Sequence, residues 1–347
     1  MIYHKQKINK RPGHVFDVLY LKNIWLSLGI SAKNGKGRKI MKKILITGAS
    51  GFIGNKLARF FLTKGYPVTG LGTSGSHPLS KGFPEFEWVS ADTSLEGDWQ
   101  HHVKTADIII NLAGHNIFRY WTKKTKQAIY DSRILTTRNL VNAIAPGSGQ
   151  TLLTTSAVGI YGDRKENELT EASNPGNGFL ARVCADWEKE GLRAREKGVR
   201  VAIMRFGVVL GDKGALSLMA SAFRMFAGGP LGNGNHWFPW IHIDDLIQAA
   251  WFILENETME GIFNFTGKEP VRQKDFAGAL GRALKRPAFI PAPAFIPAPA
   301  FMVRAIIGEL GSALLESQKA IPRRLLDSGY VFEFPEIGSA LEDVFNK

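Results

Sequence analysis

The sequence has one cysteine, Cys184, among its 347 residues. A single cysteine rules out an intrachain disulfide and any cysteine-rich metal site, and it fits a reducing compartment such as the cytoplasm. The chain also lacks any run of eighteen apolar residues, so the sequence gives no indication of a membrane span. Because 44% of its residues are hydrophobic, a chain of this length can bury a full core. We therefore expect a cytoplasmic globular protein.

Acidic residues are fewer than basic ones, at 31 against 44, which gives a net charge of +13. Most of this excess is local, because residues 1–40 hold seven Lys, two Arg and one Asp. The 307 residues that follow carry only +5. Such a small excess offers little for binding nucleic acid, so we expect no nucleic-acid partner.

Residues 1–40 are predicted to form a basic, disordered extension. Their apolar stretch, Val15–Ile30, is interrupted by Asp17 and Lys22, whereas a signal peptide needs an uninterrupted apolar stretch. Three interpretations stay open. The extension is dispensable or mis-started ahead of Met41, it forms a surface helix that contacts a partner or a membrane, or it is a targeting segment.

From Met41 onward, strand patterns alternate with helix patterns, which is typical of a parallel sheet covered on both faces. We predict a Rossmann-like, doubly wound α/β domain over residues 41–265. Residues 212–243 are expected to contribute to a smaller substrate lobe, which a small C-terminal domain over residues 266–347 completes. The predicted strands are 43–47, 67–71, 86–90, 107–111, 151–155 and 199–205. The predicted helices are 52–64, 123–144, 179–197 and 244–255.

A glycine-rich turn lies between the first predicted strand and the first predicted helix. Its first glycine permits the tight turn, the second lets the backbone approach a pyrophosphate, and the third lets the helix pack on the strand. The N-terminus of the helix then faces the phosphates with unpaired N–H groups. These features predict a dinucleotide site, and a chance glycine turn is the alternative. The residues expected to contact the cofactor here are Gly48, Ser50, Gly51, Phe52, Ile53 and Gly54.

Several later segments carry a family resemblance. They are Asn111–Gly114, Trp121, Ser132-Arg133, Arg205–Gly211, Gly228–Gly232, Trp240–Asp245 and a tail motif from Gln318 to Tyr330. In this order they resemble the short-chain dehydrogenase/reductase superfamily in its extended, epimerase-like form. Within it, the chain is most similar to an atypical subgroup described as sugar-nucleotide epimerase-like or NADP-dependent oxidoreductases, which has a small C-terminal domain of unknown role.

The position about twenty residues after the glycines bears on the choice of cofactor. In NAD-specific sites an acidic residue there bonds the ribose 2′-hydroxyl, but residues 71–75 of this chain contain no carboxylate. An acid would repel a 2′-phosphate, so its absence favours NADP, with NAD as the alternative. Thr73 and Ser74 can donate hydroxyls to that phosphate. The subgroup usually has an arginine near Thr73, and the resemblance implies that Arg133 supplies the charge instead, unless it is a solvated helix cation.

The resemblance implies further cofactor contacts. Asp92, after the third predicted strand, fits the position that contacts the adenine amino group, and a plain loop aspartate is the alternative. Leu112, Ala113 and Gly114 end the next strand, where small residues let a ribose lie against the backbone. Val209 matches a position near the nicotinamide, although it could equally belong to the core.

Reductases of this superfamily use a Tyr-x-x-x-Lys pair on a helix. The lysine lowers the pKa of the tyrosine and holds the nicotinamide ribose, and the tyrosine exchanges the substrate proton. The corresponding helix of this chain has Leu180 and Cys184 in the two places. Ser156 and Tyr161 are the remaining candidates, because both follow the strand predicted over 151–155. We expect Tyr161 as a proton donor and Ser156 as an active-site hydrogen-bonding group, and a structural loop is the alternative for both.

The resemblance implies an NADP(H)-binding oxidoreductase or epimerase-like enzyme that acts on a carbonyl or hydroxyl group of a small molecule. The alternative is a dinucleotide-binding sensor that has lost turnover, which the missing Tyr-Lys pair favours. Related enzymes often form homodimers through helices such as those predicted over 123–144 and 179–197. We expect no metal site, since His101 and His102 have no partner cysteine and no metal-ligand spacing.

Residues 228–240 are rich in glycine and aromatic side chains. They predict either a substrate loop that closes over the nicotinamide, with polar and stacking contacts from His236 and Trp237, or a mobile connection with buried aromatics. His242 precedes a capped helix and is expected to be structural.

Overall fold

The computed structural model describes residues 32–33, 39–288 and 308–346. The chain divides into two compact units, Met1–Met41 and Lys42–Lys347. In the first unit, the short strands β1 (Ala32–Lys33) and β2 (Lys39–Ile40) pair in antiparallel fashion. The rest of the predicted basic extension lies outside the described residues.

A seven-stranded parallel sheet forms the centre of the second unit, with the strand order β13-β9-β7-β6-β3-β4-β5. The chain enters the sheet at β3, beside the central strand β6, winds outward to β5, and then returns to build the other half, which makes the sheet doubly wound. The predicted fold class is therefore confirmed. The strands are β3 (Ile44–Thr47), β4 (Val68–Gly72), β5 (Phe86–Ser90), β6 (Ile108–Asn111), β7 (Thr151–Ala157), β9 (Arg200–Phe206) and β13 (Gly261–Phe265).

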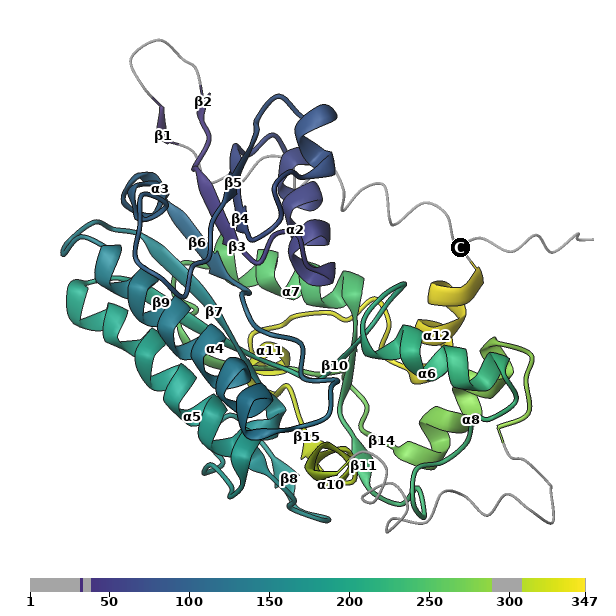
Figure 1. The fold of residues 1–347 in the computed structure, drawn as a ribbon. Coiled ribbons are helices and arrows are strands. Elements are labelled where there is room, and N and C mark those ends of the chain that lie inside the picture. The colour runs from purple at the N-terminus through teal and green to yellow at the C-terminus, as the bar shows by residue number, and fades with distance from the viewer. Residues whose placement is uncertain (1–31, 34–38, 289–307, 347) are drawn as a thin grey trace, which may run out of the picture. The chain divides into compact units, whose positions relative to one another are not determined.

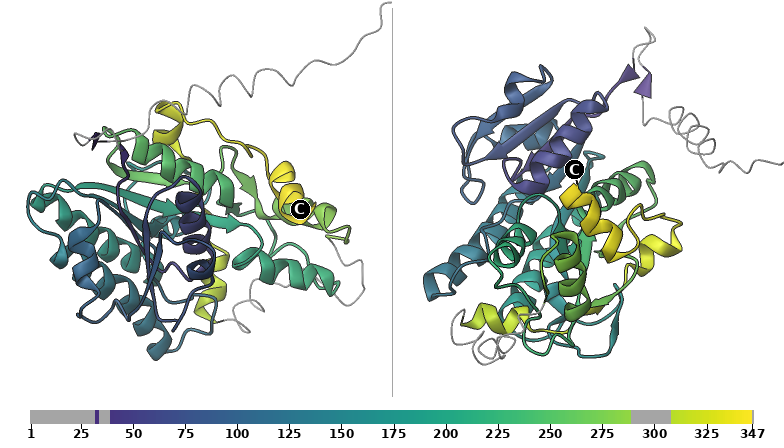
Figure 2. Two further views of the ribbon diagram at one scale, coloured as in Figure 1. Left: turned by 90° about the horizontal axis from the view of Figure 1, so that it is seen from above. Right: turned by 90° about the vertical axis from the view of Figure 1, so that its right-hand side faces the viewer.

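Helices cover both faces of this sheet, because its strands are apolar on both sides (Figures 1 and 2). On one face, α3 (Gln100–Thr105) and α5 (Phe179–Leu192) both pack on α4 (Lys123–Ala143). On the other face, α2 (Phe52–Thr63) packs on α7 (Ile243–Glu255). The aromatic side chains that join α2 to α7 are Phe60, Phe61, Tyr66 and Trp251.

A second apolar cluster gathers the later part of the chain around Phe238, Trp240, Phe276 and Leu341. The helices of this cluster are α6 (Ala215–Arg224), α8 (Gln273–Ala283) and α12 (Ile337–Asn346). Two strand pairs lie beside them, β10 (Val208–Leu210) with β12 (Trp240–His242) and β11 (Trp237–Phe238) with β14 (Val271–Arg272). The predicted domain boundary between residues 265 and 266 stays a prediction.

The last part of the chain adds short elements to this arrangement. They are α10 (Glu309–Leu314), α11 (Arg323–Asp327) and β15 (Lys319–Ala320), which pairs with β8 (Glu168–Leu169). The 3-10 turns are η1 (Pro78–Lys81), η2 (Val158–Tyr161) and η3 (Arg193–Lys197). Within the described parts of the chain, no helix combines the length and the apolar character needed to cross a membrane.

Asp245 anchors the C-terminal segment to the first turn of α7. Its buried carboxylate accepts hydrogen bonds from the backbone N–H groups of Glu333, at 2.8 Å, and Phe334, at 3.0 Å. The hydroxyl of Tyr330 donates to the backbone oxygen of Asp245 at 2.9 Å. The acidic end of the Trp240–Asp245 segment is therefore explained by packing between distant parts of the chain.

Candidate functional site

The glycine turn joins β3 to α2 at the carboxyl end of the sheet. Gly48 has a φ of +68°, and a Cβ there would lie 2.9 Å from the backbone oxygen of Leu112, so only glycine fits without strain. A Cβ on Gly54 would collide with the backbone oxygen of Gly48. The turn is closed by the N–H of Gly51, which donates to that same oxygen at 2.9 Å. The three glycines thus bring β3, α2 and the end of β6 into close contact.

The N-terminus of α2 has no side-chain cap. The helix starts at Phe52 after Gly51, and no side chain of the described residues accepts from its first-turn N–H groups. Such donors, with the partial positive charge of the helix end, form an anion-binding site. The loop after β10 lies alongside, since Lys56 pairs with Asp212 at 3.3 Å and a Cβ on Gly214 would touch the Phe52 ring at 3.5 Å.

A group of hydroxyls lies at the carboxyl end of β4, next to this turn. A Cβ on Gly72 would lie 2.9 Å from Oγ of Ser50, so the Ser50 hydroxyl reaches the end of that strand. Thr73 and Ser74 follow and are exposed, and the backbone oxygen of Ser74 accepts from Nε1 of Trp88 at 2.9 Å. Ser50, Thr73 and Ser74 therefore place hydroxyl groups at the end of β4, and residues 71–75 themselves contain no carboxylate.

Two other predicted contacts have local partners. Asp92 is exposed, and its Oδ1 accepts from the backbone N–H of Ser94 at 3.0 Å and from its hydroxyl at 2.6 Å. Val209 is partly buried in β10, where it lies opposite Ile241. The contacts of Asp92 match those of a plain loop aspartate, and both predicted cofactor contacts stay predictions.

A buried polar network that sequence reasoning missed lies beneath the turn. Oγ1 of Thr47 donates to Oδ1 of Asn111 at 2.6 Å, and Nδ2 of Asn111 donates to Oγ1 of Thr137 at 2.8 Å and to Oγ1 of Thr154 at 3.1 Å. Nε1 of Trp187 donates to the same Thr137 hydroxyl at 2.8 Å. The network joins three strands to α4 and α5, and the only sequence signal for it was the asparagine that ends β6.

The same network holds the backbone that the resemblance associates with a ribose. The N–H groups of Leu112 and Ala113 donate to Oγ1 of Thr47 at 3.2 and 3.3 Å. Gly114 follows directly, and its missing Cβ leaves the backbone open toward Arg133. The end of β6 is thus held in place from below by buried hydroxyl and amide groups.

Ser156 and Tyr161 belong to a second buried network, around an ion pair between Glu188 and Arg205. Oγ of Ser156 donates to Oε1 of Glu188 at 2.6 Å, and Arg205 donates to both oxygens of Glu188 at 2.8 Å. The Tyr161 hydroxyl accepts from Nη1 of Arg205 at 2.8 Å and lies 2.8 Å from Oδ1 of Asn264. Burial raises the pKa of Tyr161, although Arg205 lowers it in part.

This arrangement bears directly on the predicted catalytic roles. Tyr161 has no exposed surface and Ser156 has 1%, so neither hydroxyl is open to a substrate. Within the described residues, both hydroxyls form hydrogen bonds with groups of the chain itself, which matches the structural-loop alternative. The catalytic assignments of Ser156 and Tyr161 stay predictions.

The two places of the missing Tyr-Lys pair lie on the inner side of α5. Leu180 belongs to an apolar group with Trp121 and Leu310. Cys184 is buried, and this burial raises the pKa of its thiol to about 11, so the thiol stays protonated at neutral pH. Neither side chain provides acid-base chemistry.

Arg133 reaches the end of β6 from α4. Its Nη1 donates to the backbone oxygens of His115, at 3.1 Å, and Ile129, at 3.0 Å, and its guanidinium carbon lies 5.2 Å from the centre of the Trp187 ring. Because β3 lies between β6 and β4 in the sheet, the structure does not bring Arg133 together with Thr73. The predicted contact between Arg133 and the cofactor stays a prediction.

Trp237, a predicted substrate contact, is held in a surface cluster. Its Nε1 donates to Oε2 of Glu166 at 3.1 Å, and the guanidinium carbon of Arg272 lies 3.8 Å from its ring centre. Arg272 also pairs with Glu166 at 2.7 Å. Neighbouring His236 is partly buried, which lowers its pKa, and within the described residues its Nε2 has no hydrogen-bond partner.

A surface hollow of about 460 Å³ opens at the N-terminus of α5. On one side, Lys126 of α4 and Glu309 of α10 form an ion pair at 2.8 Å. On the other side lie residues 176–179 together with Arg182. The C-terminal part of the chain therefore contributes to the surface beside the helix that carries Leu180.

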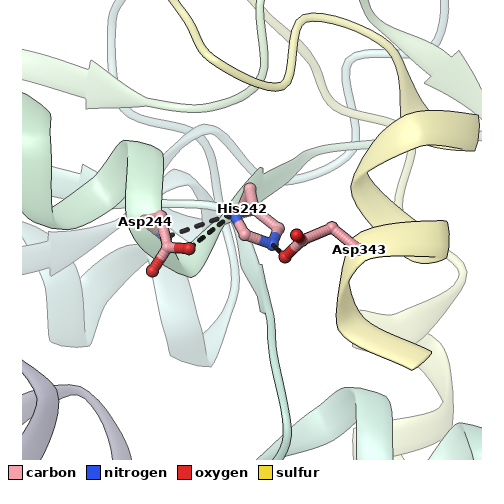
Figure 3. Close-up of side chains that lie close together, drawn as sticks. All are labelled: His242, Asp244 and Asp343. Atoms are coloured by element: carbon pink, nitrogen blue, oxygen red, sulfur yellow. Dashed lines mark hydrogen bonds and ion pairs between the residues drawn. The ribbon is translucent and has the colours of Figure 1, made fainter. Parts of the chain in front are cut away.

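His242, Asp244 and Asp343 form a group with metal-ligand chemistry, and their ligand atoms lie within 4.8 Å of one another. Nδ1 of His242 accepts from the backbone N–H of Asp244 at 3.2 Å, whereas Nε2 lies 3.3 Å from Oδ2 of Asp343. Figure 3 shows the two aspartates at opposite edges of the imidazole ring. Metal ligands must converge on one point, so this geometry fits a link between α7 and α12.

Known proteins match this chain over most of its length. The profile described as NAD dependent epimerase/dehydratase family matches residues 44–265, and a domain of unknown function (DUF1731) matches residues 298–344. The epimerase family protein SDR39U1 homolog, chloroplastic, of Arabidopsis thaliana is 36% identical over 306 residues, with 87% of this chain and 86% of that protein covered. The epimerase family protein YfhF of Bacillus subtilis is 36% identical over 304 residues, covering 87% and 97%.

A solved structure agrees with these matches. The crystal structure of human epimerase family protein SDR39U1 (isoform2) with NADPH has a TM-score of 0.76 and 32% identity to this chain, and it covers 88% of this chain and 99% of the human one. The glycine turn, the doubly wound sheet and these similarities lead to one conclusion. The chain belongs to the NAD dependent epimerase/dehydratase family and carries a C-terminal DUF1731 domain.

Proposed function

We propose that the chain is an NADP(H)-binding oxidoreductase or epimerase-like enzyme that acts on a carbonyl or hydroxyl group of a small molecule. The observation that carries the proposal is the uncapped start of α2 beside the hydroxyls at the end of β4. The pyrophosphate oxygens of the dinucleotide would bind at the start of α2, and a 2′-phosphate would contact Ser50, Thr73 and Ser74. That the related human protein was crystallised with NADPH supports the choice of cofactor.

The residues of the chain fit this dinucleotide at several points. Gly48 and Gly54 let the turn pack closely, because Cβ atoms at these positions would meet backbone atoms, and a turn this tight lets a pyrophosphate approach the main-chain N–H groups. Leu112 and Ala113 are held by Thr47, which gives the ribose a rigid surface. When bound, NADP(H) supplies or accepts the hydride, and the chain supplies binding and orientation.

The preference for NADPH is tested by fluorescence titration of the full chain with NADPH and NADH side by side. We expect tight binding of NADPH and weak binding of NADH. In Thr73→Asp, a carboxylate repels the 2′-phosphate, so we expect NADPH to bind about tenfold more weakly, with NADH unchanged or tighter. Ser80→Asp adds the same charge at an exposed position of η1 and serves as the control. Binding of neither dinucleotide to the wild type would refute the proposal.

A dinucleotide-binding sensor without turnover is the second candidate. It is favoured by Leu180 and Cys184 in the Tyr-Lys places and by the buried hydroxyl of Tyr161. Hydride transfer separates the two candidates, because an enzyme oxidises bound NADPH with at least one carbonyl compound of a broad panel. Absence of transfer across the panel, with NADPH binding intact, would favour the sensor.

A cytoplasmic location and a homodimer are further parts of the proposal. The single cysteine supports a reducing compartment, and the paired helices α4 and α5 offer a surface of the kind through which related enzymes dimerise. Cell fractionation and light scattering of the full chain test the two points.

A further inference from the structure

Three segments that are far apart in the sequence, around Asp163, Trp237 and Ser317, meet beyond the turn η2. The backbone N–H of Ser317 donates to Oδ1 of Asp163 at 3.1 Å, and its hydroxyl donates to the backbone oxygen of Lys165 at 2.7 Å. The backbone N–H of Trp237 donates to the same hydroxyl at 3.1 Å. These hydrogen bonds hold the three segments together.

Each segment carries one titratable side chain, and we call Asp163, His236 and Glu316 the titratable cluster. Burial raises the pKa of Glu316 to about 7, and the charge of Asp163 acts in the same direction. Burial lowers the pKa of His236, and Asp163 acts against it. Since one carboxylate acts on both of the other groups, the three side chains are neighbours. Asp163 is exposed and Glu316 is part-buried, so the cluster opens at the surface.

The titratable cluster has hydrogen-bonding capacity that the chain does not use. The buried Nε2 of His236 has no partner within the described residues, and buried polar atoms of this kind are rare. Oε2 of Glu316 accepts from Nε2 of Gln318 at 3.2 Å, and within the same part of the chain Oε1 accepts no hydrogen bond. A ligand with hydroxyl or carbonyl groups would supply the missing partners.

Glu316 differs from the other buried carboxylates of the molecule. Glu188 pairs with Arg205 at 2.8 Å, and Asp245 accepts from two backbone N–H groups. Glu316 instead lies near a like charge, which costs stability at neutral pH. A carboxyl group whose pKa is raised by burial and by a specific charge is typical of functional sites.

The charged side chains that flank the cluster are directed to other partners. Arg164 donates to backbone oxygens, Lys165 is exposed, Lys319 pairs with Glu168, Arg272 pairs with Glu166, and Glu309 pairs with Lys126. Among the charged neighbours, Asp163 is therefore the one that acts on Glu316.

The titratable cluster lies on the side of the sheet where the nicotinamide half of the cofactor would bind. Asp163 follows β7 by way of η2, so it lies beyond the carboxyl end of that strand, and β7 pairs with β6. Ligands of open α/β sheets bind beyond the carboxyl ends of the strands, with each half of a dinucleotide over one half of the sheet. Because the proposed 2′-phosphate lies at β4, the nicotinamide half comes over β6 and β7.

The helix before Glu316 reaches the missing Tyr-Lys places. Leu310 and Leu314 of α10 pack in the same apolar group as Leu180. Glu316 follows two residues after Leu314, so its carboxyl group comes from the part of the chain that covers Leu180. The C-terminal segment thus brings a carboxyl group toward the place where α5 has no tyrosine.

We propose that Glu316, with Asp163 and His236 as its neighbours, exchanges a proton with the substrate during hydride transfer. The inference rests on the proposed function and fills the role that α5 leaves open. When a carbonyl group is reduced, its carbon receives the hydride of NADPH, which leaves NADP⁺, and its oxygen receives the proton of the Glu316 carboxyl group. The Glu316 carboxylate regains a proton from water, so atoms and charge balance.

The test needs no substrate, because the nicotinamide ring is cationic in NADP⁺ and neutral in NADPH. Both ligands carry the same phosphates, so phosphate titration cancels in the ratio of the two dissociation constants. An ionised Glu316 beside the ring attracts NADP⁺ alone. Between about pH 6 and about pH 8.5 we therefore expect NADP⁺ to gain affinity about three- to tenfold relative to NADPH, with a midpoint near pH 7. Calorimetric titration of the full chain with each ligand measures this ratio.

In Glu316→Gln the ratio should not depend on pH. Glu342→Gln removes an exposed carboxylate of α12 and, as the matched control, should behave as the wild type. With any carbonyl compound that the wild type reduces, Glu316→Gln should also lower kcat by about 100-fold. A ratio independent of pH in the wild type, a pH dependence that survives Glu316→Gln, or an unchanged kcat would overturn the inference. Failure of the wild type to bind either ligand would instead refute the proposed function itself.

Discussion

The two halves of the parallel sheet end in different chemistry. At β3 and β4 the strand ends expose backbone N–H groups and the hydroxyls of Ser50 and Thr73. At β7 and β9 the polar side chains turn inward, where Ser156 joins the ion pair of Glu188 and Arg205. One half is thus open to a ligand, and the other uses its polar groups to hold the fold.

This difference follows from what cofactor binding and acid-base chemistry each require. A dinucleotide is bound largely by main-chain groups, so glycines and a helix end suffice. Acid-base chemistry needs side chains that reach the substrate, and Ser156 and Tyr161 do not reach the surface. Burial lowers the pKa of Arg205, but its bonds to Glu188 outweigh burial and keep the pKa above its ordinary value, so Arg205 stays charged.

The largest expected effect tests the inward-facing half. Arg205→Met leaves Glu188 buried without its partner, which should lower the free energy of unfolding by about 3–5 kcal/mol. Replacing both residues by Met removes the unpaired charge and should recover most of this loss. Urea unfolding measures both. A double variant no more stable than the single one would contradict the role of the pair.

Gly48→Ala tests the open half. The new Cβ meets the backbone of Leu112 in a left-handed conformation, so we expect about 1–2 kcal/mol of lost stability and at least about tenfold weaker NADPH binding. Gly65→Ala is the matched control, because Gly65 also has a positive φ, +83°, but has open space around it. It should share the loss of stability and keep its affinity for NADPH. Equal losses of affinity in both variants would contradict the expectation.

Tyr161→Phe distinguishes a structural from a catalytic hydroxyl. Without the hydroxyl, Arg205 and Asn264 lose a buried partner, and the free energy of unfolding should fall by about 1–2 kcal/mol. Binding of NADPH, measured by fluorescence, should not change. If turnover disappeared while stability stayed the same, the hydroxyl would have a catalytic role after all.

The smallest effect concerns Glu316, whose pKa is raised to about 7 by burial and by the charge of Asp163. The folded state holds this proton more tightly than the unfolded state, where the pKa is about 4.3. The stability that the protonated Glu316 side chain contributes is therefore fully present below about pH 4 and is lost as the pH rises toward 7. Because the side chain is partly exposed, we expect Glu316→Gln to exceed the wild type by only about 1 kcal/mol at pH 8.

Thermal unfolding at pH 4 and pH 8 measures this difference, which should vanish at the lower pH. Glu166 provides the contrast, since its bonds to Arg272 lower its pKa to about 2. Glu166→Gln should therefore act in the opposite direction, with a loss of stability that is present above about pH 4 and is lost only as the pH falls through about 2. The same sign for both variants would contradict these assignments.

Much of the fold could be predicted from local patterns. The six predicted strands lie within two residues of the observed ones, because buried parallel strands are short apolar runs between glycine and polar turns. The strand β13 (Gly261–Phe265) was missed, since its apolar run is interrupted by Asn264. The helix predicted over 179–197 ends earlier, at Leu192, and continues as the turn η3.

In the candidate site, too, features made by neighbouring residues could be predicted, whereas contacts between distant residues could not. The glycine turn could be predicted because its three glycines lie within seven residues of sequence. The hydroxyls near position 73 could be predicted because they directly follow the strand. The hydrogen-bond partners of Tyr161 could not be predicted, because Arg205 and Asn264 lie 44 and 103 residues away in the sequence. The network around Asn111 joins residues from three strands and two helices for the same reason.

The sequence by itself determined the strand–turn–helix unit, the doubly wound sheet and the missing carboxylate after β4, since each depends on neighbours along the chain. Only the tertiary structure decided which polar side chains face a ligand and which face one another. It buried Ser156 and Tyr161 around Arg205 and brought Arg133 of α4 beside Cys184 of α5. Contacts of this kind depend on how distant elements pack, and the spacing of residues in a single sequence carries no record of that packing.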